Sequence, residues 1–114
     1  MESKVFTYGE LSIPFNLADY EVMERLETAH EVFKQAATDA KAHGRASAQT
    51  RAIIEAVNAF LDSVLGAGSA QKAHGGTKDA EVAMDALAAL FAFAEEQKSA
   101  SAEKMSRYLP VGNK

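Results

Sequence analysis

The most apolar stretch of the chain reads AQTRAIIEAVNAFLDSVL, from Ala48 to Leu65. Its large apolar residues recur mainly at steps of three and four, which places them on one face of an α-helix. Ser47 is a suitable N-cap, and Gly66 and Gly68 end the pattern because glycine disfavours helix. We therefore predict a core helix over residues 48–65. Its buried face comprises Ile53, Ile54, Val57, Phe60, Leu61, Val64 and Leu65.

A second helical pattern precedes this stretch. It starts after Asn16 or Asp19, either of which can accept hydrogen bonds from the free N–H groups of a first turn. It is predicted to end at Gly44, as a left-handed residue after the helix. Its apolar residues recur at steps of three and four and are Tyr20, Met23, Leu26, Ala29/His30, Phe33 and Ala37.

A third helical pattern follows an irregular, glycine-containing segment over residues 66–78, in which Ser69 is predicted to cap one short turn. Thr77 or Asp79 is predicted to cap the last helix, which we expect to run to about Lys98. Its apolar face comprises Val82/Ala83, Ala86, Leu87, Leu90, Phe91 and Ala94.

The segment from Lys4 to Phe15 has the only β-type pattern. Val5 to Tyr8 favour a strand, and after Gly9 and Glu10 the apolar residues alternate with Ser12 and Pro14. Two short runs around a glycine-containing turn indicate a β-hairpin. A lone hairpin is marginal in water, so this one is expected either to cover the helices or to pair with another chain.

Together these patterns predict a mainly α fold, with a short N-terminal β-hairpin followed by a bundle of three principal helices and a glycine-rich connection before the last. We expect one α-rich domain over residues 1–97, with the hairpin at 4–15. Beyond Gln97 the apolar period fades, so residues 98–114 are predicted to be a polar, flexible tail, although Met105, Tyr108 and Leu109 would allow the helix to resume.

Composition excludes several classes of protein. The chain has 114 residues, a net charge of −4 and no cysteine, which rules out disulfide scaffolds and thiol chemistry. It has no concentrated basic patch of the kind that nucleic-acid grooves require. The chain has neither a secretory signal pattern nor an apolar run long enough to span a membrane. We expect a cytoplasmic protein that binds neither nucleic acid nor membrane.

No catalytic or metal-binding motif is apparent. The three histidines, His30, His43 and His74, lack the spacing of a metal site. Gly66 to Gln71 and Gly75 to Lys78 lack the complete glycine patterns of phosphate-binding loops. The carboxylates of the first predicted helix alternate with basic residues, as on a solvated face. We therefore predict a non-enzymatic protein with no cofactor, no metal and no small-molecule substrate.

Four segments of the chain carry a resemblance: IPFNLADYEVMERLE from Ile13, NAFLDSVLGAGSA from Asn58, KAHGGTKD from Lys72 and AMDALAALF from Ala83. Together they resemble a family of small, uncharacterised tail-module proteins of prophages in Gram-positive bacteria. The resemblance covers roughly residues 5–95. It departs at His74, where the family tends to have an aromatic residue before the two glycines, and at the first turn, where Tyr8-Gly9 replaces an asparagine-glycine pair.

The resemblance implies a phage tail assembly chaperone in the cytoplasm of the bacterial host. Such proteins escort the long helical tape-measure protein while the tail tube polymerises. A helix-in-groove contact of low affinity, multiplied over many copies, would suit that role. On this hypothesis Phe60, Leu90 and Phe93 contact the tape-measure protein or another copy, and Phe6 and Tyr8 take part in strand pairing between copies. The alternative for each of these residues is an ordinary place in the core.

Two other functions fit the sequence. One is a structural head–tail connector or tail completion protein, which would form a closed ring and stay in the virion. The other is a small helical regulatory dimer. A small basic cluster of Lys41, His43, Arg45 and Arg51 is compatible with it, but no basic recognition helix accompanies the cluster.

Overall fold

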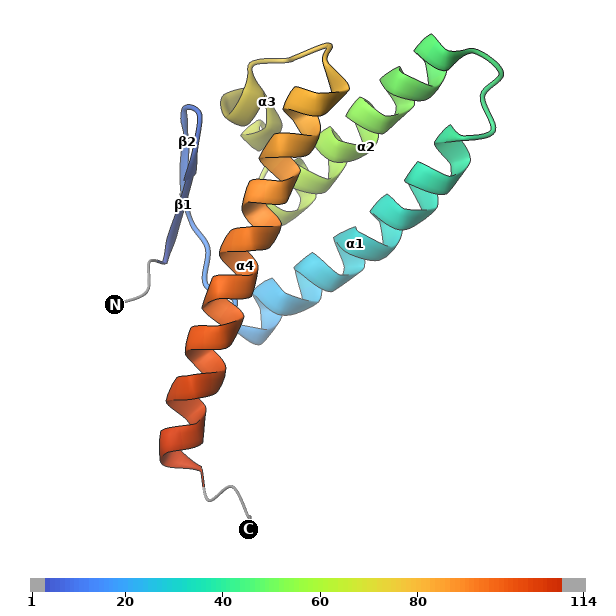
Figure 1. Cartoon of the computed structure of the whole chain (residues 1–114). Helices are drawn as coiled ribbons and strands as arrows, with labels where there is room; N and C mark the ends of the chain where they lie inside the picture. Colours follow the sequence, from blue (N-terminus) through green and yellow to red (C-terminus); the bar gives the residue numbers. More distant parts are fainter. Residues whose placement is uncertain (1–3, 110–114) are drawn as a thin grey trace.

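The computed structural model describes residues 4–109 and has the predicted fold class, mainly helical with an N-terminal hairpin (Figure 1). Two strands lead into the helices: β1 (Val5–Tyr8) and β2 (Leu11–Pro14). The helices are α1 (Tyr20–Ala40), α2 (Ala46–Leu65), the short α3 (Ser69–His74) and α4 (Ala80–Tyr108). The predicted tail residues 110–114 and the first three residues of the predicted domain lie outside the described part of the chain.

The hairpin pairs within the chain and has one buried and one exposed face. β1 and β2 are antiparallel, with Phe6 opposite Ile13 and Tyr8 opposite Leu11. Gly9 has a φ of 60°, which suits the first central position of a two-residue type II′ turn. Phe6 and Leu11 are buried and face the helices, whereas the alternate residues Val5, Thr7, Ser12 and Pro14 are exposed.

Helix α2 is the centre of the fold and packs against α1, α3 and α4. The core consists of buried apolar side chains from the hairpin and all four helices, and the predicted α2 face lies within it apart from Ile53, which is half-buried. α1 and α2 form an antiparallel pair, and α4 crosses it (Figure 1).

The predicted helix caps are correct in some places and wrong in others. Asp19 caps α1 by accepting a hydrogen bond from the Glu21 N–H, and Asp79 caps α4 by accepting from Glu81 and Val82. α2 begins one residue before Ser47, so its N-cap is Arg45, which has no capping side chain. Gly44 lies in the loop after α1 and is not left-handed, because α1 already ends at Ala40.

The hairpin turn docks on α3 through the backbone. The Glu10 N–H donates to the Lys72 carbonyl over 2.9 Å. Gly9 is so close to the Ala73 carbonyl oxygen that a Cβ atom there would clash with it. Glycine is therefore required here twice, for its positive φ and for the close approach of the two backbones.

Helix α4 is longer than the sequence pattern predicts. It continues through Lys98 to Tyr108, so the predicted helix end at about Lys98 is wrong, whereas the flexibility of the polar stretch from residue 98 stays a prediction. Serine, alanine, lysine and glutamate in this stretch are compatible with helix even where little of it packs on the rest of the chain. The C-terminal part of α4 extends beyond the other helices, which helps to make the molecule 55 Å long and 20 Å thick (Figure 1).

The last buried residue of α4 is Gln97, which is 3% exposed. Its Nε2 donates to the Phe15 carbonyl over 2.7 Å, and its Oε1 accepts from the Leu17 N–H over 2.8 Å. One side chain thus ties α4 to the connection between β2 and α1. This contact fixes the point at which α4 leaves the body of the fold.

Candidate protein-binding surfaces

Three of the five residues predicted to make protein contacts are buried. Phe60 is 2% exposed and Leu90 is 0% exposed, and Phe6 is also in the core. Almost none of their side-chain surface is exposed in this fold, which favours the alternative of a core place for Phe60 and Leu90. The reason is that both occupy the middle of helix faces that pack on neighbouring helices, where the core needs its largest side chains.

The remaining two, Tyr8 and Phe93, are half-buried parts of an aromatic cluster. The Phe93 ring lies 5.5 Å from that of Phe6 and 6.2 Å from that of Phe15, and Phe6 stacks with Tyr8 at 6.5 Å. The Phe93 ring therefore packs on aromatic rings of the N-terminal segment of its own chain. Likewise the inner faces of both strands are covered by helices, which favours a core role for Phe6 and Tyr8 over pairing between copies.

Phe91 and Phe93 lie on opposite sides of Leu90, and together they connect α4 to the α1–α2 pair and to the hairpin. The Phe91 ring lies 5.4 Å from that of Phe60 in α2 and 5.5 Å from that of His30 in α1. Phe93 faces the hairpin instead. Residues two apart on a helix point in nearly opposite directions, and α4 uses this geometry to contact the helices with one ring and the hairpin with the other.

An open groove lies between α1 and α2. Its volume is about 480 Å³. Its wall on α1 includes Ala29, Val32, Phe33 and Ala36, and its wall on α2 includes Ala56, Ala59, Phe60 and Ser63. Alanine leaves space between the two helices where a larger side chain would fill it. The result is a mainly apolar floor that is accessible from outside.

The groove opens on the side of α1 that faces away from α4. His30 contacts Phe91 of α4, and Val32 lies two residues further on, about 200° around the helix. Val32 is 61% exposed. α1 packs mainly on α2, so the groove edge that Val32 forms has no third helix to cover it.

Polar residues surround one end of the groove. Glu21, Glu24, Arg25 and Thr28 line it near the start of α1. Glu21 and Glu24 form no ion pair with any residue that the structure describes. An apolar floor with an acidic end can accept a helix that carries an apolar stripe and basic residues beside it.

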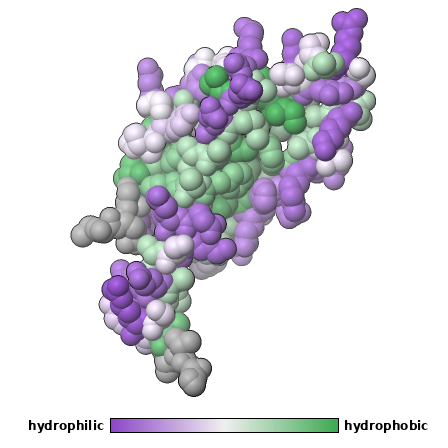
Figure 2. All heavy atoms as spheres, viewed as in Figure 1, coloured by the Kyte–Doolittle hydropathy of each residue, from purple (hydrophilic) through white to green (hydrophobic). Residues whose placement is uncertain are grey.

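A second apolar surface lies over the middle of α4. Figure 2 shows hydrophobic atoms gathered in the centre of this face, with hydrophilic atoms around them. On α4 its exposed residues include Ala88 and Ala92, with Met84 beside them. Alanine offers little side chain to anchor a partner, because hot spots are usually large aromatic residues or arginine. The α1–α2 groove is thus the better candidate.

The described residues contain no group of three or more His, Asp or Glu side chains placed to hold a metal ion. Between residues 4 and 109, no helix is both long and apolar enough to cross a bilayer. His74 has a structural place: its Nδ1 accepts from the Thr77 N–H, so its Nε2 carries the proton and donates to Asn58 Oδ1 over 2.7 Å.

The sequence pattern did not identify the groove, and two signals could have indicated it. Val32 is a large apolar residue beside the predicted α1 stripe, where a solvated face should be polar. Ala29 and Ala36 in α1 match Ala56 and Ala59 in α2, and small residues on two facing helices leave a depression between larger ones.

Comparison with known proteins gives one match. A family model matches residues 9–114, and the chain therefore belongs to this family, a family of unknown function (DUF6673). No curated protein and no solved structure matches the chain.

Proposed function

We propose that this member of a family of unknown function is a non-enzymatic phage tail assembly chaperone, which shields apolar helices of the tape-measure protein in the host cytoplasm. The resemblance of residues 5–95 to prophage tail-module proteins suggests the setting. The observation that carries the proposal is the open apolar groove between α1 and α2. A protein that transiently covers apolar helices needs such a surface in its folded state.

The dimensions of the groove suit a helix. Its lining runs along α1 from Glu21 to Ala36, about 22 Å at 1.5 Å per residue. Four turns of a client helix fit that length. A helix bound in this way would place apolar side chains at i, i+3, i+4 and i+7 against Val32, Phe33 and Ala59, which is the usual arrangement when a helix binds in a groove.

The shallow, alanine-rich floor favours weak binding per copy. Few large side chains are exposed in the groove, so each contact has few anchors. Weak contacts suit a chaperone that must dissociate before the particle is complete, and many copies along one tape measure would supply avidity. The acidic end of the groove favours client helices with lysine or arginine beside the apolar stripe.

The test is co-expression with a phage tape-measure protein from the same source genome, followed by purification and light scattering. We expect a complex with many copies of the small protein per tape measure. Val32→Glu puts a charge on the groove edge at a position that is mostly exposed, so it should weaken the complex at least tenfold without unfolding the chain. Val82→Glu is the matched control, because Val82 is an exposed valine near the N-terminus of α4, away from the groove.

Equal binding by wild type and the Val32→Glu variant would show that the groove does not hold the client. Absence of any complex with the tape-measure protein would overturn the chaperone function itself.

A structural connector that forms a ring is the second candidate. The observation in its favour is the projecting end of α4, since a protruding element that fits a neighbour is what a ring interface requires. Mass spectrometry of purified virions separates the two functions, because a connector stays in the particle and a chaperone leaves it.

A further inference from the structure

The part of α4 beyond Gln97 is a helical arm with little support from its own chain. We call residues 98–109 the arm. Only Ala100 and Ser101 in it are partly buried, and every other arm residue is exposed. A helical segment of this length is marginal in water unless one face packs on something. The arm therefore gains stability from any partner that covers it.

One face of the arm is apolar and continuous. Lys98, Ser101, Ala102 and Met105 line a notch of about 200 Å³, together with Leu17 and with Met23 of α1. Tyr108 and Leu109 follow Met105 by three and four residues and extend the same face. On α1, Tyr20 lies three residues before Met23 and points to the same side. The notch is smaller than the usual 300–1,000 Å³ of ligand pockets, which argues against a small-molecule site.

Exposed large apolar residues are concentrated at this place. Nine such residues are exposed in the described chain, and five of them belong to the arm face and its neighbour on α1: Tyr20, Met23, Met105, Tyr108 and Leu109. Tyr20 is 70% exposed and Tyr108 is 76% exposed. We call these five residues the arm patch. Isolated apolar residues on a surface are normal, but a cluster of this size marks an interaction site.

We propose that the arm patch is a self-association surface, through which two copies of the chain form a two-fold symmetric dimer. Each arm would lie across the arm and α1 of the other copy, so that Met105 and Tyr108 of one copy pack near Met23 and Tyr20 of the other. In a two-fold interface the same patch serves both partners, and this patch contains both halves of the contact. Ser101 and Ala102 leave space for the partner's larger side chains.

The area supports a second copy as the occupant. At about 200 Å² per fully exposed large side chain, the exposed fractions give on the order of 600 Å² for the arm patch. A symmetric contact would bury this area twice, about 1,200 Å², which reaches the lower bound for specific interfaces. A smaller peptide ligand would leave part of the patch exposed.

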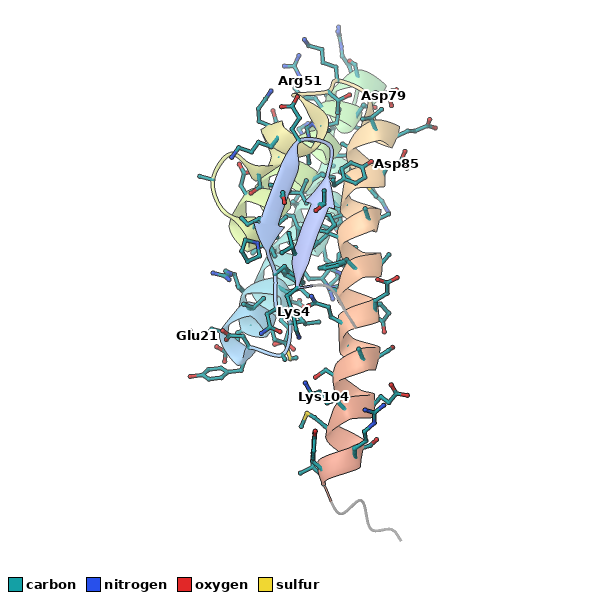
Figure 3. All side chains as sticks on the ribbon, turned by 90° about the vertical axis from the view of Figure 1, so that its left-hand side faces the viewer. Lys4, Glu21, Arg51, Asp79, Asp85 and Lys104 are labelled. Atoms are coloured by element: carbon teal, nitrogen blue, oxygen red, sulfur yellow. The ribbon has the colours of Figure 1, made fainter. Side chains whose placement is uncertain are left out.

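The charges are also complementary. The arm contains Lys98, Lys104, Arg107 and Glu103, a net charge of +2, whereas residues 20–31 of α1 contain four glutamates and one arginine, a net charge of −3. Glu24 and Glu27 each lie four residues after a patch member, Tyr20 and Met23, and share its side of α1. Figure 3 shows the arm, with Lys104, projecting beyond the body, and Glu21 at the adjacent end of α1. A crossed pair of arms would bring these opposite charges together.

The experiment measures mass by light scattering over a range of concentrations, alongside thermal unfolding. The wild type is expected to show twice the 12.2 kDa chain mass at high concentration and to dissociate on dilution. The double variant Met105→Glu/Tyr108→Glu should be monomeric, with the thermal midpoint that the wild type has at concentrations where it is dissociated, since both residues lie outside the core and only the stabilisation by the second copy is lost. Met84→Glu is the control, because Met84 is an exposed methionine earlier in α4, and this variant should dimerise as the wild type does.

Charge reversal tests how the arm of one copy is oriented on α1 of the other copy. Lys98→Glu/Lys104→Glu should raise the dimer dissociation constant about tenfold or more, and adding Glu24→Lys/Glu27→Lys should restore it. A wild type that stays at the chain mass at all concentrations overturns the proposal, as does a dimer that persists in the Met105→Glu/Tyr108→Glu variant. A closed assembly larger than a dimer overturns the two-fold arrangement. The client plays no part in these measurements, so a failed chaperone function would leave them valid.

Discussion

Replacing Gln97 by alanine tests whether a single buried side chain holds α4 against the hairpin connection. In the folded state its amide makes two short hydrogen bonds, one to the Phe15 carbonyl and one to the Leu17 N–H. Gln97→Ala removes both partners at once and leaves two buried backbone groups without them. The perturbation is local, because the alanine is compatible with the helix and creates no steric conflict.

The expected cost is about 3 kcal/mol. Leaving a buried donor or acceptor unpaired costs about 1–3 kcal/mol per group, and two groups at about 1.5 kcal/mol each give this total. For a chain of this size, 3 kcal/mol corresponds to a decrease of about 12 °C in the thermal midpoint. With a urea m-value of about 1.5 kcal/mol/M, the urea midpoint should fall by about 2 M.

The assay is urea unfolding followed by circular dichroism, since the chain has no tryptophan. Gln35→Ala is the matched control: Gln35 is exposed in α1 and its amide bonds only to Asp39, so its loss should change stability by less than 0.5 kcal/mol. Gln97→Glu retains an acceptor for Leu17 but loses the donor to Phe15, and it should be destabilised at least as much as Gln97→Ala. If Gln97→Ala is no less stable than the control, the reasoning is refuted.

Three further substitutions test separate parts of the fold. Gly9→Ala should destabilise the chain by at least about 1–2 kcal/mol through its positive φ and the Ala73 carbonyl, whereas Gly44→Ala, at an ordinary φ with open space, should be neutral or slightly stabilising; equal urea midpoints for the two would contradict this. His74→Ala should cost about 1–2 kcal/mol and speed amide exchange at Thr77, since it removes both hydrogen bonds that tie the α3–α4 linker to α2; unchanged exchange would argue against that role. Phe93→Ala should cost about 2–3 kcal/mol by opening a cavity beneath the hairpin and should leave tape-measure binding by the folded fraction unchanged. Lost binding with unchanged stability would instead make Phe93 a contact residue.

The elements with strong local signals could be predicted from the sequence. The hairpin lies where alternation and the Gly9 turn place it, and six of the seven predicted core residues of α2 are buried. In both cases one physical rule dominates, because a strand alternates its faces and a core helix shows a single apolar stripe. The caps at Asp19 and Asp79 were predictable for the same reason, since a short carboxylate side chain before a helix satisfies its first N–H groups.

The α1 register and the end of α4 could not be predicted, because both depend on neighbours that are distant in sequence. Tyr20 and Met23 fit the apolar period of α1 but are exposed, whereas Val22 joins the predicted Leu26 and Ala29 on the inner face, since that face turns toward α2. The buried state of Gln97 arises from Phe15 and Leu17, some 80 positions earlier. Gln97 is polar and follows Leu90 and Ala94 on the same side of α4, so the sequence around it does not indicate this contact.

The width of the apolar surface on α1 explains why the fold presents two candidate surfaces. One neighbouring helix covers only an arc of roughly 100°, and α2 is the neighbour on which α1 mainly packs. Met23 and Val32 are nine residues apart, which is half a turn around the helix, so they lie beyond opposite edges of that arc. The groove floor and the arm patch are thus on different sides of α1, and Glu24, at the end of the groove, is the residue that both proposed contacts use. Val32→Glu should reduce client binding without changing the dimer, Met105→Glu/Tyr108→Glu should abolish the dimer without closing the groove, and the combined variant should show the sum of both effects. Strong non-additivity in the combined variant would mean that both substitutions act on one surface, and the division of α1 into two edges would then be wrong.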